Sequence, residues 1–193
     1  MVMILSWRDF RVNFLTDMIK RGVRAFIVET FDTVNIKRGL QFYLRSSWPT
    51  SDPIANGVPR YVYFKTGAKP VIIKTRIVSY IGEEFALSIF ESPTITAETG
   101  TVINPSNLNR INPQATTVTA LKDPVVVVDG ALIDDEPEYY FGGTAQGNRD
   151  ANSIPPESER IIPANTEFLV KIEGSGRFSY RLEWFEGEAE SFD

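Results

Sequence analysis

The segment FALSIFESPTITAETGTVINPSNLNR, residues 85–110, begins as an apolar run and meets a turn signal at Ser92-Pro93. A threonine-rich stretch follows and leads through Gly100-Thr101 to a polar cluster at residues 107–110. Apolar and β-branched residues that are bounded by Ser, Pro and Gly are typical of strands that end in turns. The segment therefore predicts a strand that delivers a long loop to the edge of a β domain.

The polar end of this segment is expected to hold its own loop in shape. Asparagine side chains hydrogen-bond to local backbone and tolerate left-handed geometry, so Asn107 and Asn109 are predicted to brace the loop. Arg110 carries a rigid fork of donors that would bind loop carbonyls or a carboxylate such as Glu91. Ligand binding by these residues is the alternative to this bracing role.

The rest of the chain has the composition of a β scaffold. Its 193 residues, of which 42% are hydrophobic, are enough for one sizeable domain with a packed core. Roughly eight to ten short strands separated by turn residues predict an all-β fold, an antiparallel β-sandwich or jelly roll. We expect a helical arm at residues 1–22, the sandwich at residues 23–187 and an acidic tail at residues 188–193.

Alternation of apolar and polar residues locates the individual strands. Single strands are predicted at residues 24–29, 39–44, 85–90, 116–122 and 125–128. Residues 61–65 and 71–80 are predicted to form one hairpin, and residues 167–172 and 178–185 another, around Glu173-Gly174-Ser175-Gly176. The continuous valine run at residues 125–128 predicts a central strand that is covered on both faces. Trp48, in a loop rich in Ser and Pro, is expected to cover the core, and residues 131–156 show no clear periodicity.

One helix is predicted at residues 6–21, ahead of the strands. An apolar stripe at spacings of three and four runs along it, formed by Trp7, Phe10, Phe14 and Met18. A helix of this length is marginal by itself and must bury such a stripe against another surface. It either packs on its own domain or is an arm that docks on a neighbouring subunit.

The composition argues against several classes of function. The chain contains no histidine and no cysteine, so it lacks the commonest general base and the usual thiolate and imidazole ligands of metals. We expect a protein that is not an enzyme, with no catalytic, cofactor-binding or metal-binding residues. The net charge of −5 disfavours nucleic acid as a partner, because phosphate neutralisation supplies most of that affinity.

No membrane partner is expected either. No apolar run approaches the roughly 20 residues that span a bilayer. The apolar start of the chain, residues 1–5, is too short for a signal peptide.

The densest group of carboxylates lies in the aperiodic region and comprises Asp129, Asp134, Asp135, Glu136 and Glu138. A solvated acidic loop is the interpretation that we favour. Calcium prefers oxygen ligands, but the spacing differs from that of an EF-hand loop. Two of these acids could instead hydrolyse a glycosidic bond, which requires a fixed separation across a cleft.

Short motifs occur here in the order of a known family signature. Residues 89–94 read IFESPT, residues 100–101 read GT, and residues 107–110 read NLNR. Residues 163–170 read PANTEFLV, and residues 182–186 read LEWFE. Together these motifs resemble the signature of the head decoration, or cement, proteins of bacteriophages.

The resemblance implies a β-sandwich that binds the major-capsid lattice and stabilises it, often as a trimer or dimer. It implies a location on the capsid surface of a virion that is assembled in the host cytoplasm. The implied partners are the major capsid protein and neighbouring copies of the chain itself. In this setting the stripe of Trp7, Phe10, Phe14 and Met18 would dock on an adjacent protomer or capsid subunit.

Two other functions remain open at this point. One is a tail or baseplate component, or a receptor-binding β module, which differs from a decoration protein in its location on the virion. The other is a carbohydrate-active β-sandwich that uses the acids at residues 129–138. Exposed rings of Trp48, Tyr139 and Tyr140 beside those acids would favour the carbohydrate-active alternative.

Overall fold

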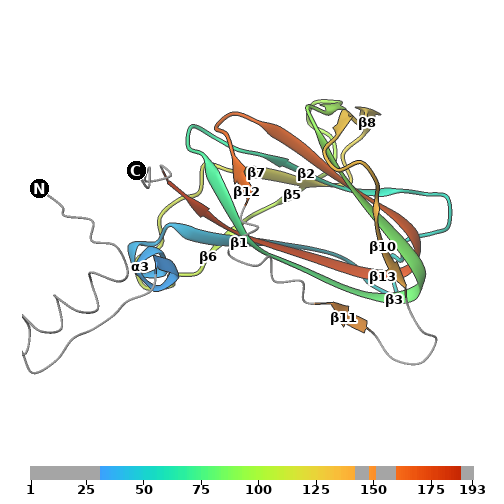
Figure 1. Cartoon of the computed structure of the whole chain (residues 1–193), viewed down its shortest axis with the longest axis horizontal. Coiled ribbons are helices and arrows are strands. Elements are labelled where there is room, and N and C mark those ends of the chain that lie inside the picture. Colours follow the sequence, from blue (N-terminus) through green and yellow to red (C-terminus); the bar gives the residue numbers. More distant parts are fainter. Residues whose placement is uncertain (1–30, 142–147, 151–159, 188–193) are drawn as a thin grey trace, which may run out of the picture. The chain divides into compact units, whose positions relative to one another are not determined.

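The computed structural model describes residues 31–141, 148–150 and 160–187 (Figure 1). The chain divides into two compact units, Met1–Thr33 and Val34–Asp193, and the sheets belong to the second. Several predicted features lie outside the described residues: the helix at residues 6–21 with its stripe of Trp7, Phe10, Phe14 and Met18, the strand at residues 24–29, and the acidic tail.

The predicted all-β antiparallel fold is confirmed. The described residues contain one short helix, α3 (Phe31–Arg38), an 11-stranded curled sheet and a separate two-stranded sheet. Helix α3 ends at Arg38 and is followed by Gly39, whose φ of 72° suits the left-handed position after a helix. No helix in the described part of the chain is long and apolar enough to cross a membrane.

Two long strands form the spine of the sheet. Strand β3 (Val71–Glu91) pairs with β13 (Glu167–Glu186) from the Phe168–Glu91 pair to the Glu186–Val71 pair. Figure 1 shows the two strands running side by side and curling together. The first half of β13 also pairs with β2 (Arg60–Lys65), and its second half pairs with β1 (Gln41–Trp48).

Glycines allow the spine to bend at its middle. The register between β3 and β13 shifts between Gly174 and Gly176. A Cβ atom at Gly176 would lie 2.2 Å from the carbonyl oxygen of Ile81, and one at Gly82 would lie 2.2 Å from that of Ser175. Only glycine permits this close approach of the two backbones, so the strands fold over without a chain reversal.

The bend gives the sheet two halves that face each other across the core. Beside β2 lie β7 (Thr119–Lys122) and β5 (Thr101–Ile103), and beside β1 lies β6 (Ser106–Asn107). The ring of Phe64, from the β2 half, meets that of Trp184, from the β1 half, at 5.3 Å in an edge-on contact. Phe42 stacks on the same indole at 6.1 Å. The architecture is therefore sandwich-like, with one apolar core.

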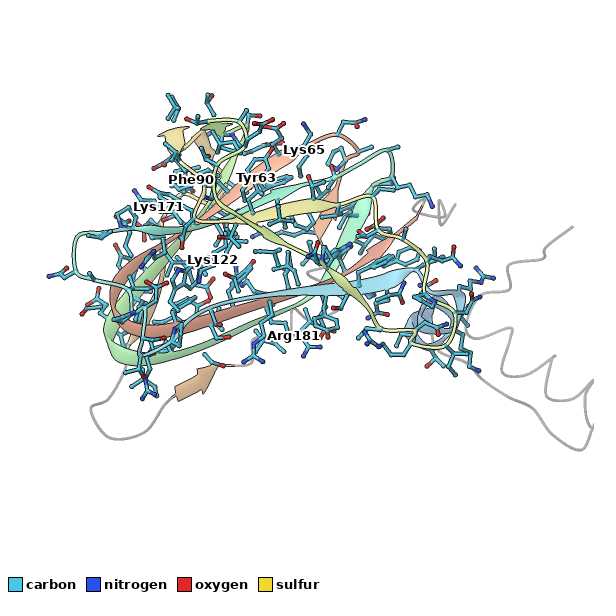
Figure 2. All side chains as sticks on the ribbon, turned by 180° about the vertical axis from the view of Figure 1, so that it is seen from behind. Tyr63, Lys65, Phe90, Lys122, Lys171 and Arg181 are labelled. Carbon is cyan, nitrogen blue, oxygen red and sulfur yellow. The ribbon has the colours of Figure 1, made fainter. Side chains whose placement is uncertain are left out.

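The face of the sheet away from this core is apolar in one row. Tyr63, Leu169 and Phe90 are neighbours across β2, β13 and β3 (Figure 2). Leu169 is fully buried, and Tyr63 is 6% exposed. Burial, and then the carboxylate of Glu167, raise the pKa of Tyr63 above its ordinary value.

Four short strands line the other edge of β3. They are β9 (Ala131–Leu132), β10 (Glu138–Phe141), β11 (Asn148–Asp150) and β12 (Arg160–Ile162). The first three fall in the region that showed no clear periodicity. Strands of two to four residues are too short for alternation to be seen in the sequence.

Both predicted hairpins are wrong. Residues 167–172 and 178–185 belong to the single strand β13, because the glycines between them bulge and bend the chain without reversing it. Residues 61–65 do not pair with residues 71–80, since β13 lies between β2 and β3. The strand predicted at residues 85–90 is likewise not separate, because it continues from residues 71–80 within β3.

The valine run is also placed differently from its prediction. Among the described residues, strand β8 (Val126–Val128) pairs only with β4 (Thr94–Ile95) in the small separate sheet, and Val127 is 64% exposed. The prediction of a central, doubly covered strand is therefore wrong. Trp48 ends β1, outside the expected loop, but its ring is fully buried in the core, as predicted.

Candidate binding surface

The asparagines of the 107–110 cluster bind backbone from three parts of the chain. Asn107 donates from Nδ2 to the carbonyls of Gly39, at 2.7 Å, and Gln114, at 3.0 Å, and its Oδ1 accepts from the amide of Asn109 at 2.7 Å. Asn109 donates from Nδ2 to the carbonyl of Lys37 at 2.8 Å. These bonds fasten the loop to the end of α3.

Glu91, one of the possible partners predicted for Arg110, makes no contact with it in the described part of the chain. Glu91 is exposed at the end of β3, where its backbone pairs with Phe168 and Ala131. Arg110 is exposed at the rim of a groove. The structure brings Asn107, Asn109 and Arg110 together and leaves Glu91 elsewhere.

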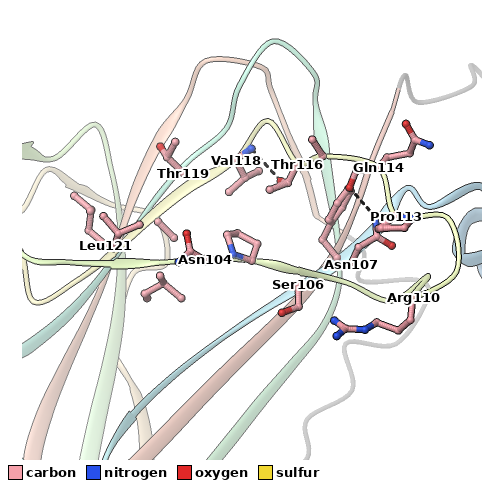
Figure 3. A pocket seen from close by; sticks show the side chains of 16 residues that line it. Asn104, Ser106, Asn107, Arg110, Pro113, Gln114, Thr116, Val118, Thr119 and Leu121 are labelled. Carbon is pink, nitrogen blue, oxygen red and sulfur yellow. Dashed lines mark hydrogen bonds between the residues drawn. The ribbon is translucent and has the colours of Figure 1, made fainter.

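The groove has a volume of about 830 Å³ and opens where residues 102–107 separate from residues 113–121 (Figure 3). These two segments are paired as β5 and β7 at one end and diverge toward the other. The lining comprises Phe42, residues 102–107, Arg110, residues 113–116 and residues 118–121. Figure 3 shows Arg110 and Leu121 at opposite ends of this opening.

The chemistry of the groove suits binding. Its floor includes Phe42, Val118 and Ala120, which are buried core residues. Its polar groups are amides, hydroxyls and the guanidinium of Arg110. This set donates and accepts hydrogen bonds but holds no group that exchanges a proton easily near neutral pH.

A buried carboxylate fixes one wall of the groove. Glu186 is 2% exposed, and its Oε2 accepts from the amide and hydroxyl of Thr117 at 2.9 and 3.0 Å. Its Oε1 accepts from the indole of Trp184 at 3.1 Å and from the hydroxyl of Thr116. The end of β13 thereby holds the segment that lines the groove.

A second carboxylate, that of Asp123, ties separate segments together at the far end of β7. The Oδ2 of Asp123 accepts from the indole of Trp48 at 2.9 Å and from Arg60 at 3.2 Å. Its Oδ1 accepts from the amide of Tyr61 at 2.9 Å. We call Glu186 and Asp123 carboxylate hubs, because each binds several donors. Neither was predicted from the sequence. The available signal was a charged residue on the apolar face of a strand, as in Trp184-Phe185-Glu186, where alternation places Glu186 on the side of Trp184.

The carboxylates at residues 129–138 do not converge. Asp129 pairs with Lys171 at 3.3 Å, Asp134 with Arg160 at 3.0 Å, and Glu138 with Arg76. Asp135 and Glu136 are exposed. Within the described ranges no three acidic side chains are grouped closely enough to hold a metal ion.

The aromatic residues near these acids are divided between surface and core. Tyr139 and Phe141 are 51% and 67% exposed and stack on each other at 6.3 Å. Tyr140 and Trp48 are buried. Trp48 is therefore not available on the surface as the exposed ring that would favour a carbohydrate-active site.

Comparison with known proteins finds no matching family model, no matching curated relative and no matching solved structure.

Proposed function

We propose that this protein is a non-enzymatic structural protein of a bacteriophage head, which binds the outside of the major-capsid lattice and stabilises it. Its partners in this proposal are the major capsid protein and neighbouring copies of itself, in a trimer or dimer.

The observation that supports the proposal most is the spatial arrangement of the family-like motifs. Residues 89–91 of the first motif pair directly with residues 168–170 of the closing segment. Asn107 pairs with Phe42, which pairs in turn with Trp184 of the LEWFE motif. Motifs scattered over about half of the chain thus lie on neighbouring strands of one sheet, as the parts of a single surface would.

The groove and the rigid scaffold support the same proposal. The groove is open and combines an apolar floor with hydrogen-bonding groups, as a protein partner requires. The two carboxylate hubs and the asparagine loop hold its walls in place, which lowers the entropic cost of binding. On a repeated lattice a dimer or trimer binds several capsid sites at once. Even a weak contact per copy then holds the oligomer firmly on the head.

Uptake by undecorated heads tests the proposal. Purified protein is mixed with expanded heads that lack decoration, and the bound fraction is measured by sedimentation over a range of concentrations. We expect saturable uptake and a higher temperature of head disruption. Absence of both would refute the proposal.

A matched pair of variants tests the groove within the same experiment. Arg110→Glu reverses the charge at the groove and should weaken uptake at least about fivefold, since a charge facing a complementary surface affects association strongly. Lys69→Glu makes the same change at an exposed position outside the groove lining and should have little effect. Equal losses in both variants would mean that net charge, and not the groove, controls uptake.

A position on the tail is the second outcome to distinguish. Antibody labelling over the shell is expected for a decoration protein, and labelling at the tail tip would favour a tail, baseplate or receptor-binding component.

A further inference from the structure

A run of valines lies on the surface of the small sheet. Val125, Val127 and Val128 are 56%, 64% and 56% exposed, and Leu132 and Ile133, a few residues on, are each 39% exposed. Contiguous exposed apolar residues on a soluble domain commonly mark a site of interaction. A sequence typical of a buried strand is thus left uncovered by the described residues, and such conflicts between local pattern and fold concentrate at functional sites.

The exposed valines at positions 125, 127 and 128, here called the valine strip, are held rigidly by hydrogen bonds. The amide of Val125 donates to the hydroxyl of Thr99 at 3.0 Å, and its carbonyl accepts from the amide of Thr96 at 2.8 Å. At the other end Gly130 has a φ of 101°, and a Cβ atom there would lie 2.3 Å from the carbonyl oxygen of Glu91. A pre-shaped surface loses little conformational entropy when a partner binds.

Strand β8 also has an unpaired side within the described part of the chain. It bonds only to β4 in a sheet of two strands, so half of its N–H and C=O groups point away from a neighbour. An edge of this kind accepts an additional strand, with backbone hydrogen bonds along it and side chains packing on the exposed valines.

The rim of the strip is acidic. Glu98 lies in the turn that holds Val125, and Glu91, Asp135 and Glu136 are exposed beside or shortly after the strip. The cations that contact the acids directly after the strip, Lys171 and Arg160, are engaged by Asp129 and Asp134. Two copies meeting symmetrically at this strip would bring identical acidic rims together, which is unfavourable. The charge therefore selects a basic partner over a second copy.

We propose that β8 binds an extended, basic segment of another polypeptide, which adds to the β4–β8 sheet as a third strand. The valines pack against alternate apolar residues of that segment, and the acidic rim attracts its lysines or arginines. This surface is separate from the groove and does not depend on a place on a capsid.

Synthetic peptides test the proposal on the isolated full chain. The probe is a capped hexapeptide of alternating lysine and valine, and the matched control replaces each lysine with glutamate. Binding is measured by fluorescence anisotropy of labelled peptide. We expect saturable binding of the basic peptide that weakens as salt rises, because exposed charges are screened, and at least about tenfold weaker binding of the acidic one.

Variants locate the site. The double substitution Val125→Thr and Val127→Thr keeps β-branched shape and should lower affinity for the basic peptide by about tenfold, since it removes apolar contact at two positions. Val58→Thr, at another valine that is 54% exposed, should leave affinity unchanged. No saturable binding, or equal affinity for the acidic peptide, would overturn the proposal. Self-association in sedimentation that the double substitution abolishes would also overturn it, because the occupant would then be a second copy.

Discussion

At the scale of single residues, two carboxylates organise the ends of the sandwich, the buried one of Glu186 and the half-buried one of Asp123. Each binds the indole of one tryptophan, Asp123 that of Trp48 and Glu186 that of Trp184. Each also binds backbone or hydroxyl donors on a separate segment. A buried charge is costly unless all its hydrogen-bonding capacity is used. The donors around Glu186 meet that requirement, so removing the carboxylate leaves several buried donors without an acceptor.

Replacing Glu186 tests this account. Glu186→Ala should lower the free energy of unfolding by about 2–4 kcal/mol, because the indole and the two threonines lose charged acceptors. Glu186→Gln, which keeps the shape and one acceptor, should lose about half as much. Urea unfolding followed by tryptophan fluorescence measures both. Glu173→Ala, at an exposed carboxylate near Lys171, is the control and should change stability by less than about 1 kcal/mol.

Asp123 permits a second test, because it has a left-handed backbone. Its φ is 50°, a left-handed conformation that Asn adopts at lower cost than Ala. Asp123→Asn should lower the free energy of unfolding by about 1–2 kcal/mol through the loss of charge, and Asp123→Ala by about 3 kcal/mol or more, since strain is added to three lost bonds. Equal effects of the two substitutions would contradict the role of the backbone. Chemical denaturation of both variants provides the comparison.

What the sequence predicts at this scale depends on how local the bond is. The amide of Asn109 and the side chain of Asn107 are two residues apart, so their bond follows from the preference of asparagine for nearby backbone. The bond between Thr116 and Glu186 spans 70 positions. No local pattern contains it. The groove wall that this bond supports therefore could not be predicted from composition or spacing.

At the scale of elements, alternation located most strand positions but not their connections. Residues 173–176 contain two glycines around a serine, which suits both a hairpin turn and a bulge. The structure uses them as a bulge, because the facing glycine at position 82 lets the partner strand bend at the same place. A pairing partner more than 80 positions away therefore decides between a hairpin turn and a bulge. The local sequence of residues 173–176 does not contain this information.

The glycine bend makes a prediction about the spine. Gly176→Ala places a methyl group against the carbonyl of Ile81, at a φ of +131°. Neither backbone can move without breaking the β3–β13 ladder. The substitution should lower the free energy of unfolding by about 3 kcal/mol or more, or abolish soluble expression.

The control for this variant is Gly57→Ala. Gly57 also has a positive φ, +73°, but an added Cβ atom there meets nothing within 4 Å. Only the cost of left-handed geometry remains, about 1–2 kcal/mol. If both variants were equally stable, close backbone approach would not be the reason for glycine at position 176.

At the scale of the whole molecule, the long strands pass through both halves and make the core continuous. The two halves are also tied along the edge of β3 that pairs with the short strands. Arg76, from one half of that strand, pairs with Glu138 of β10, which lies along the other half. The hydroxyl of Tyr80 donates to the carbonyl of Phe141 at 2.6 Å. Loss of order in one half should therefore destabilise the other, and unfolding is expected to be a single transition.

Buried phenols give this single transition a characteristic dependence on pH. Burial raises the pKa of Tyr180 from its ordinary value of 10.0 to about 12, and it raises the pKa of Tyr140 further. The unfolded chain releases these protons near pH 10 while the folded chain retains them. Because the unfolded state then binds fewer protons, stability should fall as pH rises from 10 toward 12 and should be insensitive to these groups below that window.

Denaturant unfolding at a series of alkaline pH values measures this slope, and the ultraviolet absorbance of phenolate reports the ionisation. Tyr180→Phe removes one of the groups and should make the slope shallower. Phe178→Leu, in the same core, should lower stability by about 1 kcal/mol at every pH and leave the slope unchanged. A phenol that stays protonated only in the folded state must contribute to the pH dependence of stability. If Tyr180→Phe leaves the slope unchanged, other groups cause the loss of stability at alkaline pH.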